Sequence, residues 1–310
     1  MIQIGVDFGG TKVEAAALDA SGTLLAKARV PNPGGYDKAL IAVRELVTGL
    51  EQKLGARGTL GVGAPGSISP ATGVMRNANS LYLNGRRFRE DLSDALQRPV
   101  RLANDANCLA LSEAVDGAGA GARVVFAIIL GTGCGGGLVV DGKLIEGGNG
   151  IAGEWGHMPL PWPTVEEREG PRCWCGQNSC LEMWVSGTGL RRDFRETTGR
   201  DWSGEEIIDA WRGGDPAATT AFDQLMDRLG RSVAVLCNIL DPDAIVVGGG
   251  LSNVPEVCQR LPGLVSRHVF ADRWSTRIKP AVWGDASGVR GAARLWSVEE
   301  ARELLAAPAA

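Results

Sequence analysis

Short apolar runs broken by glycine-containing turns fill the first thirty residues of the chain. Runs of this length with polar ends are typical of strands, and they predict strands over 2–8, 13–18 and 23–30. From Tyr36 to Leu54 the pattern changes, because apolar residues there recur every three or four positions. That spacing places them on one face and predicts an amphipathic helix.

The next sixty residues continue this alternation of strands and helices. A buried strand is predicted over 60–64, a short helix over 90–97 and a short strand over 100–102. Asn104 and Asp105 then open a helix that continues to about Val115, since both residue types are good helix caps. Strands that alternate with helices predict an α/β fold.

The N-terminal pattern begins again near the middle of the chain. The apolar run 124–130 predicts a strand that ends in Gly131-Thr132-Gly133, as the first strand ends in a Gly-Thr loop. In both places a second strand, a turn and a third strand follow. Similarity at this distance indicates two related halves. Farther on, a long helix is predicted over 217–240 and a buried strand over 244–247.

Chain length also predicts two domains, because 310 residues exceed what one compact core usually holds. We place an N-terminal α/β domain at 1–118 and a C-terminal α/β domain at 119–288, with the boundary in the small-residue run 117–121. A late helix, at about 289–306, is expected to return to the first domain.

Composition and charge restrict the function classes. The net charge is −4 and basic residues are scattered, so neither nucleic acid nor a membrane surface is an expected partner. The sequence shows no bilayer-spanning apolar stretch and no secretory pattern, and we expect a cytoplasmic protein. Glycine is the outlier, at 44 residues in short runs, which indicates tight bends or backbone close to a ligand.

The two Gly-Thr loops are candidate phosphate sites. Each lies between two strands, so neither is a P-loop or a dinucleotide fingerprint. Bare backbone amides beside a hydroxyl can still bind phosphate oxygens. One such loop would be a plain hairpin turn, but two in equivalent positions favour a shared function. The glycine run continues to Gly137, and we interpret it as functional, since each mid-strand glycine costs ~0.5–1 kcal/mol relative to alanine.

Acidic residues follow two strand ends. Asp7 ends an apolar strand, where a carboxylate either caps the loop or faces a hydrated Mg²⁺. Asp105 and the neighbouring Asn104 both suit a helix cap. The functional alternative is a carboxylate that takes a proton from a sugar hydroxyl. Spacing alone leaves both interpretations open.

The most specific motif is a cysteine cluster that follows a histidine. Cys173, Cys175 and Cys180 have the spacing C-x-C-x₄-C, and His157 lies 16 residues before the first of them. Three thiolates and one imidazole form a tetrahedral set that Zn²⁺ prefers, and four protein ligands make a structural site. The alternative, buried free cysteines, is disfavoured by the Gly, Gln, Asn and Ser residues between them.

Glu154 and Glu182 flank this cluster in the sequence. The predicted metal would fix both carboxylates in one place, where charge-assisted hydrogen bonds hold the hydroxyls of a sugar. For each glutamate alone, a solvated surface charge is the alternative.

Together these motifs resemble the ROK family of sugar kinases and repressors. The resemblance spans nearly the whole chain and is carried by the following segments: 7–12, 131–133, 154–157, 173–182, 284–285 and 288–293. Within the family, the stretches 65–70, 77–80 and 102–108 look most similar to bacterial fructokinases (mannofructokinases).

The resemblance implies a two-domain, actin-like (ribonuclease H-like) fold with ATP and sugar in the cleft between domains, and it implies a homodimer. The implied ATP-binding residues are Asp7, Gly9, Gly10, Thr11, Lys12, Gly131, Thr132, Gly133, Gly248, Gly249 and Gly250. The implied sugar-binding residues are Asn79, Asn104, Asp105, Glu154, His157 and Glu182. Asp105 is the implied general base, and His157 is implied to serve both zinc and sugar.

The expected activity is transfer of the γ-phosphate of ATP to the C6 hydroxyl of fructose, with mannose and glucose as further acceptors. Mg²⁺ and loop amides would stabilise the transferred group. The alternative is an N-acetylhexosamine kinase or glucokinase, although N-acetylglucosamine kinases look less similar around residues 66–85. A sugar-sensing repressor is less favoured, because repressors carry a DNA-binding segment before the sugar domain, and the first loop here begins at residue 7.

Overall fold

The computed structural model describes residues 1–306, and these form two compact units. Unit 1 contains Met1–Gly121, Gly137–Ala152 and the C-terminal segment from Val282. Unit 2 contains Ala122–Gly136 and Gly153–Ala281.

The segment Gly137–Ala152 belongs to unit 1, whereas the predicted domain limits placed it in the C-terminal domain. Its packing on helix α3 (Asp105–Asp116) accounts for this, because a β-carbon on Gly137 would lie 2.7 Å from the Ala110 side chain. The late helix expected at about 289–306 is two helices, α9 (Ser287–Arg294) and α10 (Val298–Ala306), both in unit 1. The predicted domain limits themselves stay a prediction.

Two five-stranded sheets repeat one strand order. The strands of the first are β1 (Ile2–Phe8), β2 (Lys12–Leu18), β3 (Leu24–Pro31), β4 (Gly58–Ala64) and β7 (Val100–Asn104). Those of the second are β8 (Val124–Leu130), β9 (Cys134–Val140), β10 (Lys143–Ile145), β11 (Ala244–Gly248) and β12 (Arg277–Pro280). The orders are β3-β2-β1-β4-β7 and β10-β9-β8-β11-β12, with β1, β4 and β7 parallel, and β8, β11 and β12 parallel. The predicted α/β fold and internal repeat are confirmed.

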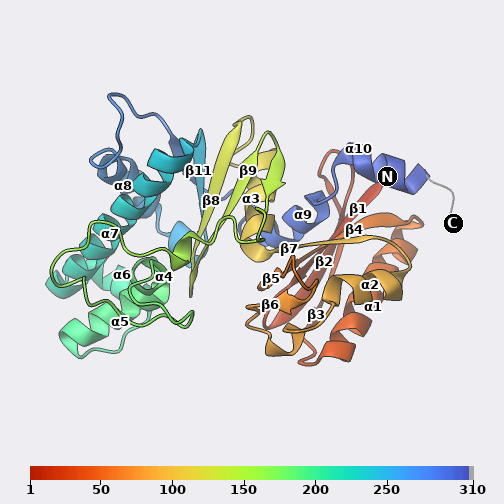
Figure 1. Cartoon of the computed structure of the whole chain (residues 1–310), viewed down its shortest axis with the longest axis horizontal. Coiled ribbons are helices and arrows are strands. Elements are labelled where there is room, and N and C mark those ends of the chain that lie inside the picture. Colours follow the sequence, from red (N-terminus) through yellow and green to blue (C-terminus); the bar gives the residue numbers. More distant parts are fainter. Residues whose placement is uncertain (307–310) are drawn as a thin grey trace. The chain divides into compact units, whose positions relative to one another are not determined.

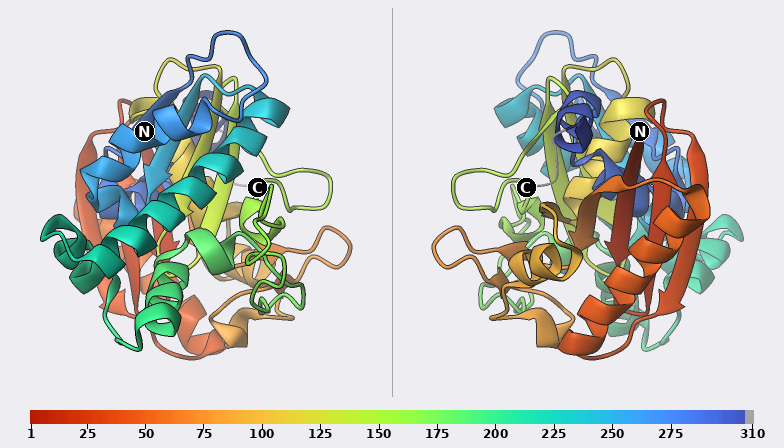
Figure 2. Two further views of the ribbon diagram at one scale, coloured as in Figure 1. Left: turned by 90° about the vertical axis from the view of Figure 1, so that its left-hand side faces the viewer. Right: turned by 90° about the vertical axis from the view of Figure 1, so that its right-hand side faces the viewer.

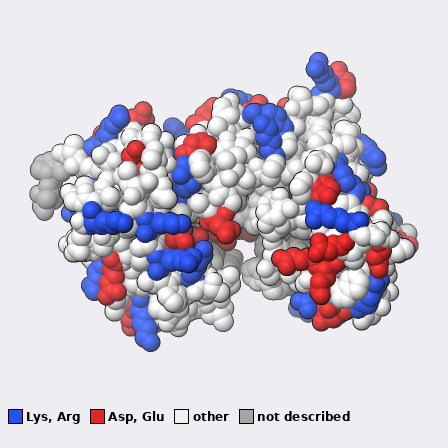
Figure 3. All heavy atoms as spheres, turned by 180° about the vertical axis from the view of Figure 1, so that it is seen from behind, with Lys and Arg blue, Asp and Glu red and all other residues white. Residues whose placement is uncertain are grey.

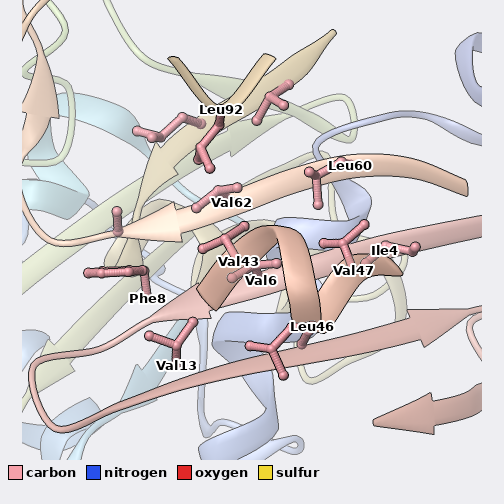
Figure 4. Close-up of a cluster of buried hydrophobic side chains, with 14 of the residues drawn as sticks. Ile4, Val6, Phe8, Val13, Val43, Leu46, Val47, Leu60, Val62 and Leu92 are labelled. Carbon is pink, nitrogen blue, oxygen red and sulfur yellow. The ribbon is translucent and has the colours of Figure 1, made fainter. Parts of the chain in front are cut away.

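Helix α1 (Tyr36–Leu54) covers one face of the first sheet (Figure 2). Its buried residues Val43, Leu46 and Val47 lie against Val6 and other apolar side chains of the strands (Figure 4). Burying a side chain of this size stabilises the fold by ~1.5–3 kcal/mol. The predicted amphipathic helix is confirmed with both of its ends.

Helix α9 packs on the other face of the same sheet. Gly5 alternates with the core residues of β1, so it faces away from α1, and a β-carbon there would lie 2.0 Å from the Val289 carbonyl. A β-carbon on Gly61 of β4 would lie 1.9 Å from the Ala292 carbonyl. Glycine at these two positions therefore allows the helix backbone to lie directly on the strands.

Shorter elements complete unit 1. They are the hairpin β5 (Ser67–Ile68) and β6 (Met75–Arg76), the 3₁₀ turns η1 (Leu81–Leu83) and η4 (Gly284–Ala286), and helix α2 (Phe88–Leu96). The segment before α10 is fixed to the sheet, because the Trp296 indole donates to the Leu60 carbonyl at 2.8 Å. Arg101 of β7 pairs with Glu300 of α10 at 2.6 Å.

Helix α7 (Pro216–Leu240) is the centre of unit 2, with α5 (Gly187–Thr198), α6 (Gly204–Arg212) and α8 (Pro255–Val265) packed around it (Figure 1). The remaining elements are the turns η2 (Trp155–His157) and η3 (Gly250–Asn253) and the short helix α4 (Glu182–Val185). The helix predicted at 217–240 and the strand predicted at 244–247 are confirmed.

A buried ion network fixes the segment that leads to the cysteine-rich loop. Glu167 is buried and accepts hydrogen bonds from Arg228 at 2.7 Å and from Arg231 at 3.0 Å, both on α7. Arg231 also donates to the carbonyls of Pro161 and Trp162, each at 2.8 Å. Removing one partner of such a network would leave a buried charge unpaired, which is costly.

Surface charge is mixed. On the face shown in Figure 3, acidic and basic side chains lie interspersed between neutral ones. Among residues 1–306, no helix combines the length and the apolar character that crossing a bilayer requires.

Candidate active site and metal centre

The polar residues of unit 1 gather where its parallel strands end. Asp7 of β1 lies opposite Gly63 of β4, and Ala64 of β4 lies opposite Asn104 of β7. Carboxyl ends of parallel strands share one edge of a sheet, which is where α/β proteins bind ligands. The structure thus brings Asp7, the first Gly-Thr loop, Asn104 and Asp105 to one edge.

The two candidate cap residues of α3 have different roles. Asn104 is the cap, because its Oδ1 accepts the Asn107 N–H at 2.7 Å. Asp105 is the first residue of the helix, and its Oδ1 accepts the Ala106 N–H at 2.8 Å. Solvent reaches Asp105, yet protein encloses most of its carboxyl, and this desolvation raises the pKa of Asp105 above its usual value. A carboxylate with a raised pKa suits a general base.

Asp7 is a second carboxylate whose ionised form is disfavoured by its surroundings. Its pKa is raised to about 6, mainly by burial and also by the charge of Asp105, while Lys12 opposes the shift. Helix α9 begins beside it, since a β-carbon on Gly288 would lie 3.0 Å from Asp7 Oδ2. A cation would relieve the charge of both carboxylates, so this edge fits the hard oxygen chemistry of Mg²⁺.

The first Gly-Thr loop is a tight turn. The Gly9 N–H donates to the Lys12 carbonyl at 3.0 Å, and Asn32 donates to the Gly9 carbonyl at 2.7 Å. The amides of Gly10 and Thr11 have no hydrogen-bond partner within residues 1–306. Two unpaired, neighbouring amides form an anion site.

Asn79 lies on the loop after the β5–β6 hairpin. Asn79 is exposed, and its side chain has no hydrogen bond to any residue in the described part of the chain. The loop is held by Asn84, which both donates to and accepts from Ala78 at 2.9 Å. The structure therefore leaves the predicted sugar contact of Asn79 a prediction.

The second Gly-Thr loop, after β8, is docked on the start of α5. The Gly187 N–H donates to the Gly131 carbonyl at 2.8 Å, and the Thr188 hydroxyl donates to the Thr132 carbonyl at 2.7 Å. In the part of the chain that the structure covers, the amides of Thr132 and Gly133 have no partner. Both predicted phosphate loops thus have the same kind of open turn.

The glycines that follow this loop have structural reasons, contrary to the interpretation that the whole run is functional. A β-carbon on Gly136 would lie 2.7 Å from the Trp155 ring, and one on Gly137 would meet α3. Trp155 also donates to the Gly135 carbonyl at 2.8 Å. The run therefore allows close packing on β9, whereas a β-carbon on Gly131 would meet no atom within 4 Å.

Glu182 connects the second loop with the cysteine-rich loop. Its Oε2 accepts the Cys134 N–H at 3.0 Å, and its Oε1 accepts the Trp174 indole N–H at 2.8 Å. A β-carbon on Gly133 would lie 2.5 Å from the same Oε2. Each carboxylate oxygen keeps a further lone pair, so the predicted sugar contact stays a prediction.

The four predicted metal ligands are brought together. The ligand atoms of His157, Cys173, Cys175 and Cys180 all lie within 4.8 Å of one another. The Sγ atoms of Cys175 and Cys180 are 3.5 Å apart, and Cys173 Sγ is 3.7 Å from His157 Nδ1. A zinc tetrahedron with bonds of ~2.3 Å to sulfur needs edges of about this length. The residues present fit Zn²⁺.

The second nitrogen of His157 lies near Glu154. His157 Nε2 lies 4.0 Å from Glu154 Oε2, within the short turn η2. A metal held through Nδ1 would fix the orientation of the ring and leave Nε2 toward Glu154. This geometry is what one ring nitrogen for zinc and one for sugar would require.

The Gly248–Gly250 loop follows β11, the parallel neighbour of β8. A β-carbon on Gly249 would lie 2.6 Å from the Leu130 carbonyl, and Gly249 has a φ of 81°. Glycine is needed there for both reasons. The structure thus brings this loop beside the second Gly-Thr loop.

Each unit has a hollow; Asn104 lines the one in unit 1, whereas Asp7, Asp105 and the first Gly-Thr loop do not. In unit 1, a cavity of about 1020 Å³ lies along β7 and includes Asn104 and Asn107 in its wall. In unit 2, a hollow of about 770 Å³ is lined by Thr132, Trp174 and Glu182, among others. Small-molecule sites in proteins have volumes in this range.

Three residues of the candidate site were not predicted from the sequence: Asn32 and Thr188, which donate to the Gly-Thr loops, and Trp174, which donates to Glu182. Asn32 follows β3 and precedes a proline, so it reads as the end of a strand. Thr188 lies in Ser186-Gly187-Thr188-Gly189, where a cap residue and two glycines signal a helix start in close contact with other backbone. This pattern predicts a close backbone contact, but it does not indicate which loop is contacted.

The repeated strand order with two equivalent loops defines the actin-like ATPase fold. The chain matches the ROK family over residues 3–299, and it belongs to this family. Over 294 residues it is 42% identical to an N-acetylgalactosamine kinase from Shewanella sp. (strain ANA-3), covering 94% of this chain and 95% of that one. Over 296 residues it is 40% identical to an N-acetyl-D-glucosamine kinase from Pectobacterium atrosepticum, covering 94% and 97%. The crystal structure of a ROK hexokinase from Thermus thermophilus matches with a TM-score of 0.87 and 31% identity, covering 98% and 100%.

These relatives confirm a sugar kinase of the ROK family. They support the alternative prediction, an N-acetylhexosamine kinase, better than the fructokinase that the stretches 65–70 and 77–80 favoured. The structure gives those stretches a role in folding: Gly66 has a φ of 79°, and a β-carbon on it would lie 2.7 Å from the Ala78 amide. Gly66 therefore keeps a hairpin closed.

Proposed function

We propose that this protein is an ATP-dependent N-acetylhexosamine kinase, with N-acetylglucosamine and N-acetylgalactosamine as first candidates. The proposed phosphotransfer is supported above all by Asp105, a carboxylate with a raised pKa at the edge where the parallel strands end. The names of the two curated relatives support the choice of sugar.

Unit 1 supplies the base and one phosphate loop. Asp105 takes the proton of the attacking sugar hydroxyl, and Asn104, fixed as a helix cap, lies beside it to orient the sugar. The amides of Gly10 and Thr11 hold phosphate oxygens. Asp7 would hold a hydrated Mg²⁺, which neutralises developing phosphoryl charge when bound, and Asp105 stays free to act as the base.

Unit 2 supplies the second phosphate loop and the remaining sugar contacts. The amides of Thr132 and Gly133 hold phosphate oxygens, and Glu154, His157 and Glu182 orient sugar hydroxyls. The loop Gly248–Gly250 lies beside them for the adenosine part. His157 and the three cysteines would hold a structural Zn²⁺, whose contribution is to fix this loop.

The test is a coupled assay with ATP and Mg²⁺ across a panel of acceptors: N-acetylglucosamine, N-acetylgalactosamine, N-acetylmannosamine, glucose, mannose and fructose. We expect the highest kcat/KM for one of the N-acetylhexosamines. Selectivity over the parent hexose should be about tenfold or more, since a site that hydrogen-bonds an amide leaves polar groups unpaired without it. If fructose gave a kcat/KM ten times that of every N-acetylhexosamine, the proposed sugar class would be wrong.

A further inference from the structure

Both Gly-Thr loops are held through their carbonyl groups by residues outside the loop. In unit 2, the Thr188 hydroxyl donates to the Thr132 carbonyl at 2.7 Å, and the Gly187 N–H donates to the Gly131 carbonyl at 2.8 Å. A β-carbon on Gly187 would lie 3.1 Å from the Gly131 carbonyl oxygen, so α5 approaches the loop closely. On the α5 side, these two hydrogen bonds are accepted by carbonyl groups of the loop.

Because a peptide group is planar, these hydrogen bonds to the carbonyls also determine where the neighbouring N–H groups point. A trans peptide group points its N–H opposite to its C=O. The Thr132 carbonyl and the Gly133 N–H belong to one peptide group, so the bond from Thr188 points the Gly133 N–H away from α5. The bond from Gly187 does the same for the Thr132 N–H. Neither amide has a partner within the described residues 1–306.

Unit 1 uses the same arrangement with a different side chain. The Asn32 side-chain amide donates to the Gly9 carbonyl at 2.7 Å, which points the Gly10 N–H the other way. Asn32 is itself fixed, because its Oδ1 accepts the Tyr82 hydroxyl at 2.6 Å and the Gly34 N–H at 3.0 Å. The Gly10 amide likewise lacks a partner in the described part of the chain.

We propose that Thr188 and Asn32 are positioning residues, each of which points one open amide of a Gly-Thr loop, the Gly133 N–H and the Gly10 N–H respectively, at the phosphate oxygens of a bound nucleoside triphosphate. The inference rests on the proposed kinase function. Neither side chain needs to touch the nucleotide, because each acts through a loop carbonyl. Amides that are oriented in advance bind a phosphate without a cost of reorientation.

Thr188 is tested with three variants whose nucleotide affinity is measured by calorimetry without sugar. Thr188→Val removes the hydroxyl at constant shape, and Thr188→Ser keeps it. Thr197→Val is the matched control, because Thr197 on the same helix donates to the Asp193 carbonyl at 2.8 Å, away from the loop. We expect Thr188→Val to weaken ATP binding roughly 3- to 10-fold, the factor that one lost hydrogen bond corresponds to. Thr188→Ser and Thr197→Val should stay within about twofold of the parent protein.

Asn32 is tested with Asn32→Asp, which keeps the acceptor for Tyr82 and Gly34 but places an oxygen against the Gly9 carbonyl. It should weaken ATP binding at least as much as Thr188→Val, with an unchanged dissociation constant for the sugar. Tyr82→Phe, which only loosens Asn32, should give a smaller effect in the same direction. A general loss of structure would instead lower the melting temperature and weaken both ligands.

The outcomes separate this inference from the proposed function. If the parent protein binds ATP but phosphorylates no N-acetylhexosamine, the proposed function fails while the affinity series still decides the role of Thr188 and Asn32. If the parent is an active N-acetylhexosamine kinase and Thr188→Val and Asn32→Asp both bind ATP like the parent, the inference is wrong. If the parent binds no nucleoside triphosphate, both are wrong.

Discussion

The two units hold their polar residues in different ways. In unit 1, Asp7 and Asp105 lie at the ends of strands or the start of a helix, and the backbone hydrogen bonds of the sheet and α3 fix them. In unit 2, Glu154, His157 and the cysteines lie on a long segment with little regular structure, between β10 and α4. In unit 1 the regular secondary structure holds the polar side chains in place, whereas in unit 2 contacts between distant parts of the segment must do so.

The cross-links of unit 2 are of two kinds. The ion network of Glu167 with Arg228 and Arg231 fixes the middle of the segment on α7. The His157 and cysteine cluster joins its two ends, and Glu182 connects it with the second Gly-Thr loop. Damage in unit 1 should therefore remove chemistry and spare the fold, while damage in unit 2 should affect both.

Asp105→Asn tests whether a change in unit 1 removes activity without destabilising the fold. We expect kcat to fall by ~10²-fold or more, since a general base contributes ~10²–10⁴-fold, while the melting temperature and the sugar affinity stay close to those of the parent. Steady-state kinetics and a melting curve measure this. Asp94→Asn, an exposed residue of α2, is the matched control for loss of one charge in the same unit. Near-normal turnover would reduce Asp105 to a residue of the first helical turn.

The corresponding change in unit 2 is Cys175→Ser. We expect it to lower the zinc content from about one per chain, to lower the melting temperature by about 5 °C or more, and to lower activity as well. Chelation of the parent protein should do the same. Cys258→Ser is the control, because Cys258 lies on α8, outside the cluster. Elemental analysis decides the assignment: fully active protein with less than about a tenth of a zinc per chain would contradict it.

Most of unit 1 follows from the sequence, because periodicity fixes its elements. Helix α1 has both predicted ends, and the parallel strands then bring Asp7 and Asp105 to one edge. The His157 and cysteine cluster was predicted for a different reason, since ligand chemistry requires those residue types at short spacing. In both cases a local pattern has one physical explanation.

The remaining features depend on contacts between distant segments. Asn104 and Asp105 are equally good caps by composition, and only the helix geometry shows that Asn104 is the cap. Gly136 is required by the Trp155 ring, which is nineteen positions away along the chain. The stretches around Gly66, which favoured fructose, close a hairpin, and the relatives support the alternative of an N-acetylhexosamine better.

The smallest expected effect concerns Asp7 and the pH dependence of the stability of unit 1. Its pKa is raised to about 6 in the folded protein, first by burial and then by Asp105. A carboxyl with a raised folded pKa stabilises the fold only while it is protonated. Its stabilising contribution is complete below the unfolded pKa of about 4 and is lost as the pH rises through about 6.

Asp7→Asn, which keeps the shape of the side chain, should therefore remove this loss. Without Mg²⁺ or nucleotide, we expect the variant to be more stable than the parent at pH 8 by ~1–3 kcal/mol, and the difference should shrink toward zero between pH 6 and 4. Urea unfolding at several pH values measures it. Asp105→Asn should reduce the same pH dependence in part, because it removes one of the charges that raise the pKa of Asp7. A variant Asp7→Asn that is less stable than the parent at every pH would show that the Asp7 carboxylate contributes favourable contacts that outweigh its desolvation.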